Sequence, residues 1–208
     1  MIISCLSQKG GVGKSSIART LAVEFTRAGW AVLLADIDAS QKTADEWSEK
    51  RRNVAGIDPA VLTESFKITA KALAQASEYD LVVIDGAPHA TKGTLDAALA
   101  SDLTILPTGT SVDDMKTQIK IAIELVDSGV SYDKLWFALY CVASKSQERQ
   151  ALETIRECGF NVFEHTVPFS AGYINAFDAG YCATETSYTT LNKKAGGLIT
   201  DIINRVTG

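Results

Sequence analysis

Apolar residues in this chain fall into short runs separated by longer amphipathic stretches. The runs predict strands at 1–6, 31–35, 79–85, 103–106, 134–142 and 161–166, with a weaker one at 60–63. The intervening stretches predict helices at 14–28, 42–52, 67–77, 91–100, 113–128, 146–158 and 188–205. Short continuous apolar runs that alternate with helices are typical of strands buried on both faces. The pattern therefore predicts an α/β fold, with a mostly parallel twisted sheet and helices on both faces.

Finer features of the pattern predict how the helices begin, end and face the sheet. Gly29 follows the first predicted helix and is a natural C-terminal cap. In the stretch 113–128, the apolar residues at helical spacing are expected to face the sheet; they are Met115, Ile119, Ala122, Ile123 and Val126. We find no linker, repeat or low-complexity tract, so residues 1–208 are interpreted as a single domain.

Composition agrees with a globular domain. The chain has 208 residues, 46% of them hydrophobic and 22% charged, which is ordinary for such proteins. A chain of this length can bury about two thirds of its unfolded surface. No apolar stretch reaches the roughly 18–20 residues that span a bilayer. A glycine-rich motif starts within the first ten residues, so we expect no signal peptide before it and a cytoplasmic location.

Cysteine usage and net charge narrow the possible functions. The four cysteines, Cys5, Cys141, Cys158 and Cys182, show no C-x-x-C spacing, so we expect buried reduced thiols rather than disulfides or metal ligands. The net charge is −5. Any contact with DNA would therefore require a local basic patch.

The glycine-rich motif has the composition of a phosphate-binding loop. After the first apolar run, residues 8–16 read Gln8-Lys9-Gly10-Gly11-Val12-Gly13-Lys14-Ser15-Ser16. The glycines let the backbone turn tightly and point its N–H groups at a phosphate. Lys14 can reach the β- and γ-phosphates, and the Ser15 hydroxyl can bind Mg²⁺. The helix that begins here adds the positive end of its dipole.

Carboxylates follow two other predicted strands. Asp36 and Asp38 follow one, and Asp85 follows the other after four apolar residues. Because the carboxyl ends of parallel strands meet at one edge of a sheet, these groups should lie beside the glycine-rich loop. Ser15, Asp38 and Asp85 are the candidate Mg²⁺ site. Since Asp36 and Asp38 alternate, one can face the nucleotide while the other supports its loop.

The second lysine of the motif leads to a family resemblance. Lys9 precedes the first glycine, and K-G-G-V-G-K-S resembles the deviant Walker A motif of the ParA/MinD family. The segment 34–41 resembles the D-x-D-P-Q motif of that family, with Ala39 in place of proline. The Asp-Gly-Ala-Pro at 85–88 is similar to its D-x-P-P motif, and 167–180 is similar to the segment that borders the adenine.

The resemblance implies a P-loop NTPase fold that uses ATP and Mg²⁺. In that family the first lysine, Lys9 here, reaches across an ATP-sandwich dimer to the phosphates of the partner subunit. The second aspartate of D-x-D-P-Q, Asp38 here, orients the attacking water. Lys9, Lys14 and Asp38 are thus the catalytic candidates, and Pro168 and Phe169 are the residues expected beside the adenine.

The chain is most similar to the small ParA proteins of plasmid and chromosome partition. The resemblance implies non-specific DNA binding by an ATP-bound homodimer, a ParB-like centromere-binding partner and a nucleoid-associated location with ATP. The candidate DNA-binding residues are Lys193 and Lys194, extended by Arg149, Arg156 and Arg205. The alternative interpretation of these side chains is an ordinary solvated helix face.

Two other functions remain open at this level. A MinD-like ATPase that works on a membrane would require a basic amphipathic C-terminal helix. The C-terminal stretch does have an apolar stripe, formed by Leu198, Ile199, Ile202, Ile203 and Val206. However, within residues 197–208 Arg205 is the only basic residue and Asp201 is acidic, which favours packing against the sheet. A metabolic ATP-dependent ligase would require a substrate pocket, and neither His89 nor His165 has an obvious acidic partner in the sequence.

Overall fold

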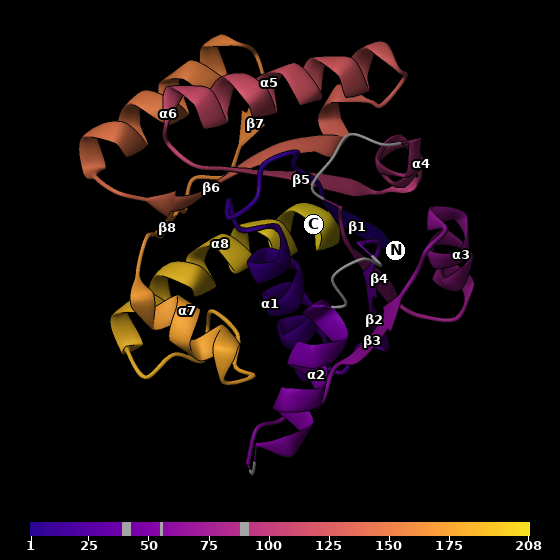
Figure 1. The fold of residues 1–208 in the computed structure, drawn as a ribbon. Helices are drawn as coiled ribbons and strands as arrows, with labels where there is room; N and C mark the ends of the chain where they lie inside the picture. Colours follow the sequence, from indigo (N-terminus) through magenta and orange to yellow (C-terminus); the bar gives the residue numbers. More distant parts are fainter. Residues whose placement is uncertain (39–42, 55, 88–91) are drawn as a thin grey trace.

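The sheet is parallel throughout its described strands and confirms the predicted fold class (Figure 1). The computed structural model describes residues 1–38, 43–54, 56–87 and 92–208. The strand order is β3-β2-β4-β1-β5-β6-β7, and β8 pairs with β6. The strands are β1 (Ile2–Cys5), β2 (Val32–Asp36), β3 (Leu62–Ser65), β4 (Leu81–Asp85), β5 (Leu103–Thr108), β6 (Leu135–Val142), β7 (Asn161–Val162) and β8 (Val167–Pro168).

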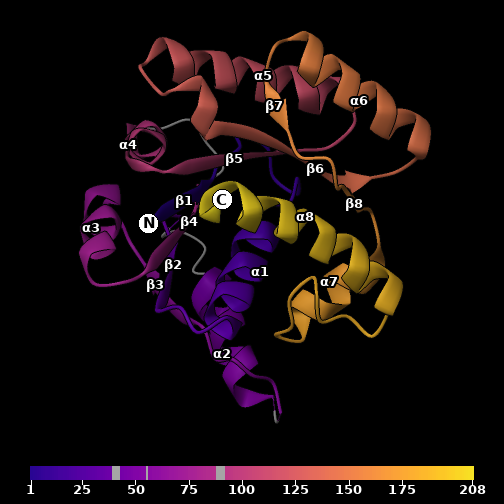
Figure 2. The ribbon, with the colours of Figure 1, turned by 180° about the vertical axis from the view of Figure 1, so that it is seen from behind.

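Helices cover both faces of this sheet (Figures 1 and 2). On one face lie α1 (Lys14–Arg27), α2 (Thr43–Asn53), α7 (Ala171–Asp178) and α8 (Thr189–Thr207). On the other lie α3 (Thr69–Ala74), α4 (Lys92–Ala100), α5 (Val112–Asp127) and α6 (Lys145–Glu157). Successive side chains of each strand point to opposite faces, so Ile3 joins the core beneath α1 and α8 while Ile2 joins the core beneath α5. This two-sided burial explains the continuous apolar runs.

One predicted strand is wrong and one helix was missed, and both lie in the last third of the chain. The strand predicted at 161–166 is replaced by the two-residue strands β7 and β8. Helix α7 was not predicted, because only Tyr173 and Ala176 of its eight residues are buried and the apolar pattern is weak. Its N-terminus is capped locally by Ser170, whose Oγ accepts a hydrogen bond from the Gly172 N–H. The weaker strand at 60–63 forms two residues later, at Leu62–Ser65.

Helix α5 faces the sheet with four of its five predicted residues, since Ile119 and Val126 also pack against the core. Met115 and Ala122 are buried as expected, but Ile123 is 48% exposed. Gln118 is buried instead, because its side chain bonds to the backbone of the sheet edge: its Nε2 donates to the Leu6 carbonyl at 2.8 Å. The predicted cap of the first helix is confirmed, since α1 ends at Arg27 and Gly29 has a φ of +90°.

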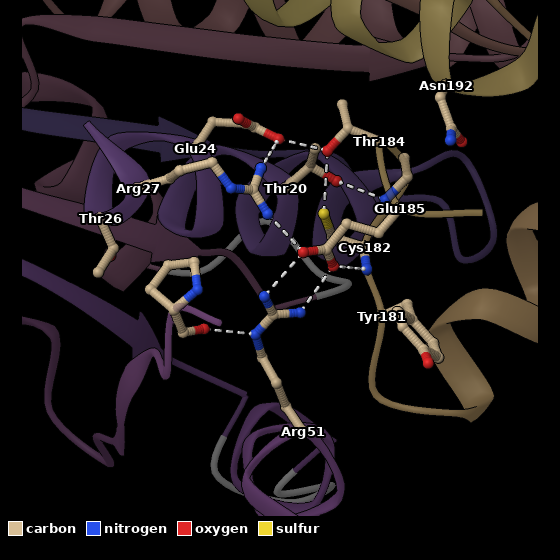
Figure 3. A network of polar contacts seen from close by, with 12 residues as sticks. Thr20, Glu24, Thr26, Arg27, Arg51, Tyr181, Cys182, Thr184, Glu185 and Asn192 are labelled. Atoms are coloured by element: carbon tan, nitrogen blue, oxygen red, sulfur yellow. Dashed lines mark hydrogen bonds and ion pairs between the residues drawn. The ribbon is translucent and has the colours of Figure 1, made fainter. Parts of the chain in front are cut away.

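A network of ion pairs fastens α1 and α2 to the loop between α7 and α8 (Figure 3). Glu185 of this loop accepts two hydrogen bonds from Arg51, at 2.7 and 2.9 Å, and one from Arg27 at 2.5 Å. Arg51 is only 1% exposed and also donates to the Gly180 carbonyl. Trp47 adds a hydrogen bond from its ring nitrogen to the Tyr181 carbonyl. Helix α2 is therefore held at its C-terminal half.

We predict that Glu185 makes stability depend on pH in the acid range. Burial alone would raise the pKa of Glu185, but the hydrogen bonds and charge of Arg51 outweigh it and lower the pKa to about 2. The stabilisation is therefore complete above the ordinary pKa of 4.5 and is lost as the pH falls from there toward 2. Glu185→Gln should lower the free energy of unfolding by ~3 kcal/mol at pH 7, because Arg51 is left buried without its anion. Urea denaturation between pH 2 and 7 measures both effects.

The matched control is Glu164→Gln, since Glu164 pairs with Arg156 on the surface, where the side chains are 74% and 46% exposed. That substitution should cost less than about 1 kcal/mol. A Glu185→Gln protein with the same pH dependence as the unsubstituted chain would contradict the interpretation.

Candidate functional site

Three strands end at the same edge of the sheet, as predicted. Asp85 is the register partner of both Cys5 in β1 and Asp36 in β2. The glycine-rich loop leaves β1 at this edge and enters α1. The carboxylates and the loop therefore lie together, at the place where parallel sheets commonly bind ligands.

The loop adopts a backbone conformation that its last glycine makes possible. Gly13 caps α1 with a φ of +101°. A Cβ at this position would lie 2.4 Å from Cγ of Tyr140, whose ring packs beneath the loop. Gly10 has neither restriction, since its φ is ordinary and a Cβ added there would meet no atom within 4 Å. The N–H groups of the first turn of α1 are thus presented at one end of a cavity.

The cavity has a volume of about 370 Å³ and extends from this loop to helix α7. Pro168 and Phe169, the predicted adenine neighbours, do line it together with the loop, and Phe169 is 64% exposed. Tyr173 and Ile174 also line the cavity and lie within 167–180, the segment expected to border the adenine. Arg19, Tyr140 and Cys141 line it as well but belong to none of the predicted site motifs, and they come from separate segments of the chain.

Lys14 lies inside the loop with its charge directed at the backbone. It is 8% exposed, and its Nζ donates to the Lys9 carbonyl at 2.9 Å. Burial lowers the pKa of Lys14, while the charges of Asp85 and Asp38 act in the opposite direction. A buried ammonium group held by a single carbonyl is well suited to receive the phosphates of a nucleotide.

The ammonium group of Lys9 is held outside the loop by helix α5. Its Nζ forms an ion pair with Oδ1 of Asp114 at 2.9 Å, and the two side chains are 39% and 24% exposed. The backbone N–H of Lys9 donates to Ser7 Oγ, which in turn donates to Gln118 Oε1 at 2.7 Å. Helix α5 therefore braces the first half of the loop through two of its side chains.

Asp85 is the best placed metal ligand. It is 3% exposed, and its Oδ1 has no hydrogen-bond partner among the described residues. Burial raises its pKa to about 6, against the opposing effects of the Ser15 hydroxyl and of the nearby cations Arg19 and Lys14. An orphaned carboxylate oxygen beside a serine hydroxyl fits Mg²⁺, which prefers oxygen ligands.

The described residues contain no group of three His, Cys, Asp or Glu side chains that could hold a metal ion. The predicted metal site of Ser15, Asp38 and Asp85 contains two carboxylates and one hydroxyl, and it stays a prediction. Mg²⁺ usually completes its coordination shell with water and with phosphate oxygens.

Asp36 supports the loop that follows β2, and a nucleotide-facing role for Asp38 stays a prediction. Asp36 is 1% exposed; its Oδ1 accepts from the Asp38 N–H at 2.8 Å and its Oδ2 from the Ala44 N–H at 3.3 Å. Burial raises the pKa of Asp36. It thus supports the backbone on both sides of residues 39–42, whereas Asp38 lies within electrostatic range of Lys14. Ala39, Pro88 and His89 lie outside the described residues.

The candidate DNA-binding residues border different grooves or have different neighbours. Lys194 borders a groove with Lys145 and Glu148, whereas Lys193 borders a different groove between α1 and α8, beside Glu24. Of the other candidates, Arg156 pairs with Glu164, Arg205 lies over the ring of Trp136, and Arg149 lies on α6. Residues adjacent in a helix point about 100° apart, which explains why the two lysines separate.

The structure also revises the histidine and cysteine expectations. His165 does have an acidic partner, because α8 brings Asp201 to 3.0 Å from its Nδ1. All four cysteines are free, as expected, but only Cys5 and Cys182 are buried. Cys141 is partly exposed with a φ of +59°, and Cys158 is exposed.

Comparison with protein families gives one match, to the family described as "CobQ/CobB/MinD/ParA nucleotide binding domain", over residues 3–180. A search of curated proteins found no match.

Similar solved structures share the fold over nearly the whole chain. The septum site-determining protein MinD of Pyrococcus horikoshii OT3, complexed with Mg-ADP, is 16% identical, with a TM-score of 0.74 and coverage of 97% of this chain and 95% of that chain. A putative plasmid partition protein of Borrelia burgdorferi B31, bound to AMPPNP, is 16% identical, with a TM-score of 0.73 and 98% coverage of both chains. The MinC:MinD cell division complex of Aquifex aeolicus contains a chain 14% identical, with a TM-score of 0.78 and coverage of 98% and 96%.

We predict that Gly13→Ala destabilises the loop before any nucleotide binds. The left-handed backbone and the overlap with the Tyr140 ring should together cost ~2–4 kcal/mol. Gly10→Ala is the matched control and should change stability little, because its position is open and its φ is ordinary. Thermal denaturation without nucleotide compares the two. Equal melting temperatures would show that Tyr140 does not restrict this position.

Proposed function

The chain is an ATPase of the CobQ/CobB/MinD/ParA family of nucleotide-binding domains, and we propose that it works as an ATP-dependent homodimer that segregates or positions DNA. Its cofactors are ATP and Mg²⁺. The observation that carries the proposal is the pair of lysines on one loop. The ammonium group of Lys14 lies inside the loop beside Asp85. The ammonium group of Lys9 lies outside the loop and pairs with Asp114.

Each residue of the site has a proposed task. Lys14 and the N–H groups at the start of α1 bind the β- and γ-phosphates. Ser15 and Asp85 hold Mg²⁺, which neutralises charge on the phosphate oxygens when it is bound. Asp38 orients the attacking water, and Asp36 positions Asp38 through the hydrogen bond to its backbone.

The proposed dimer rests on the placement of Lys9. Its ammonium group is not buried in its own site, because it is 39% exposed and paired with Asp114. Exposed ion pairs contribute little stability, so Lys9 can exchange Asp114 for the more highly charged phosphates of a partner subunit. ATP would then join two copies of the chain.

DNA is the proposed cargo, with a ParB-like protein as partner. Similarity to a plasmid partition protein supports this choice. The alternative, a MinD-like membrane contact, would need a C-terminal helix whose apolar side is available. Leu198, Ile199 and Ile202 of α8 are instead buried in the core. No helix in the described part of the chain is long and apolar enough to cross a membrane.

We predict that the two loop lysines can be separated experimentally. Lys14→Ala should abolish ATP and ADP binding, since it removes the cation inside the loop. Lys9→Ala should bind both nucleotides but fail to dimerise with ATP and lose hydrolysis, since its proposed target lies in the other subunit. Calorimetry measures binding, and light scattering measures dimerisation.

Lys116→Ala, which changes an exposed lysine on α5, is the control for loss of a charge. Normal ATP-dependent dimerisation of the Lys9→Ala protein would overturn the proposed role of Lys9. Micromolar ATP binding by Lys14→Ala would overturn the assignment of the loop.

We predict that DNA binding requires ATP, is independent of sequence and weakens with salt, because binding releases counterions. The double variant Lys193→Ala/Lys194→Ala should bind unrelated duplexes more weakly and flatten the salt dependence by about one to two units per monomer. Since the two lysines border different grooves, the single variants show which side of α8 contacts DNA. ATP hydrolysis without DNA is the control and should not change. Undiminished binding by the double variant would exclude this part of α8.

A further inference from the structure

Three buried side-chain polar atoms of the described residues have no hydrogen-bond partner, and two of them belong to residues that line the nucleotide cavity, Arg19 and Tyr140. The three atoms are Arg19 Nε, Asp85 Oδ1 and Tyr140 Oη. Such groups are rare in folded proteins, and an unsatisfied one commonly marks a ligand or water site. Asp85 is accounted for by Mg²⁺. Arg19 belongs to none of the sequence motifs described above, and its buried Nε has no hydrogen-bond partner among the described residues.

The position of Arg19 on α1 directs it toward the phosphate end of the cavity. It follows Ser15 by four residues and Ser16 by three, so all three lie on one face of the helix. Side chains in a helix lean toward its N-terminus, which here is the glycine-rich loop. Arg19 accordingly lines the same cavity as Lys14, Ser15 and Phe169.

The surroundings of Arg19 hold its charge in place but leave its Nε without a hydrogen bond. Its guanidinium lies 5.5 Å from the centre of the Trp47 ring, on helix α2. Asp85 and Asp36 are close enough to attract it electrostatically, yet its buried Nε has no hydrogen-bond partner within the described residues. Burial lowers the pKa of Arg19, as expected for a cation withdrawn from water. An arginine offers five N–H donors in a planar fork that suits phosphate oxygens.

We infer that Arg19 is an additional nucleotide-binding residue, which contacts the phosphates that ADP and ATP have in common. The inference rests on the proposed function and adds a cation to the site that the phosphate-loop motif does not include. Arg19 stands beside the first turn of α1, whereas the γ-phosphate is assigned to Lys14 and to Lys9 of the partner subunit. Its contact therefore needs neither the γ-phosphate nor a dimer.

The test compares Arg19→Met, which keeps the aliphatic stem against Trp47, with Arg19→Lys, which keeps the charge. Calorimetric titration with ADP and with ATP, each with and without Mg²⁺, should show that Arg19→Met weakens both nucleotides about 10- to 100-fold, the usual effect of losing a charge-assisted hydrogen bond. The loss should be similar with and without Mg²⁺. Arg19→Lys should lie between Arg19→Met and the unsubstituted protein. Arg52→Met is the matched control; it removes an exposed arginine that bonds only to Ser48 within α2, and its affinities should not change.

Thermal denaturation separates binding from folding. Without nucleotide, Arg19→Lys should melt as the unsubstituted protein does, and the rise in melting temperature on adding ADP should be smaller for both variants. Unchanged ADP affinity in Arg19→Met would overturn the inference. So would a loss confined to ATP, which would place the contact on the γ-phosphate, or a loss seen only with Mg²⁺, which would place it on the metal ligands. Failure of the unsubstituted protein to bind either nucleotide would instead overturn the proposed function.

Discussion

The parallel pairing of β4 with both β1 and β2 is the constraint on which the site depends. It sets Asp85 level with Cys5 on one side and with Asp36 on the other. Asp85 is therefore buried at the centre of the sheet edge, where desolvation raises its pKa and where one oxygen remains without a partner in the described residues. A buried carboxylate oxygen without a partner costs free energy. A bound cation and the phosphates of a nucleotide would therefore stabilise the sheet edge that this register creates.

Helices from the two sides of the sheet then position the parts of the chain around that edge. On one side α5 holds Lys9 through Asp114 and braces the loop through Gln118. On the other side Asp36 accepts from the first turn of α2, while Arg51, at the far end of α2, is fixed by Glu185. The segment that carries Asp38 is thus tied at both ends. The contacts nearest the nucleotide site are exposed or single hydrogen bonds, whereas those farthest from it are buried ion pairs.

Much of this arrangement could be predicted from the sequence, because the signals are local. The apolar runs give the strands, and G-K-S after a strand identifies the phosphate-binding loop without knowledge of the fold. The order of strand, carboxylate and helix also placed Asp36 and Asp85 beside the loop correctly. Predictions failed where the local signal was weak or depended on a neighbour. Helix α7 buries only two side chains, so its apolar pattern is weak. On α5 the polar Gln118 is buried because it bonds to a backbone carbonyl, while Ile123 is exposed. His165 pairs with Asp201, which lies 36 residues later in the chain.

The sequence by itself determined the fold class, the phosphate-binding loop and the carboxylates that follow its neighbouring strands, since each depends on residues within a few positions of one another. Only the tertiary structure decided what surrounds them. It brought Asp114 to Lys9 and Tyr140 beneath Gly13, and it left Arg19 Nε without a hydrogen-bond partner among the described residues. In the folded chain Lys193 and Lys194 also border different grooves. Contacts between residues a hundred positions apart are set by sheet register and helix rotation, which the spacing of residues along one segment does not encode.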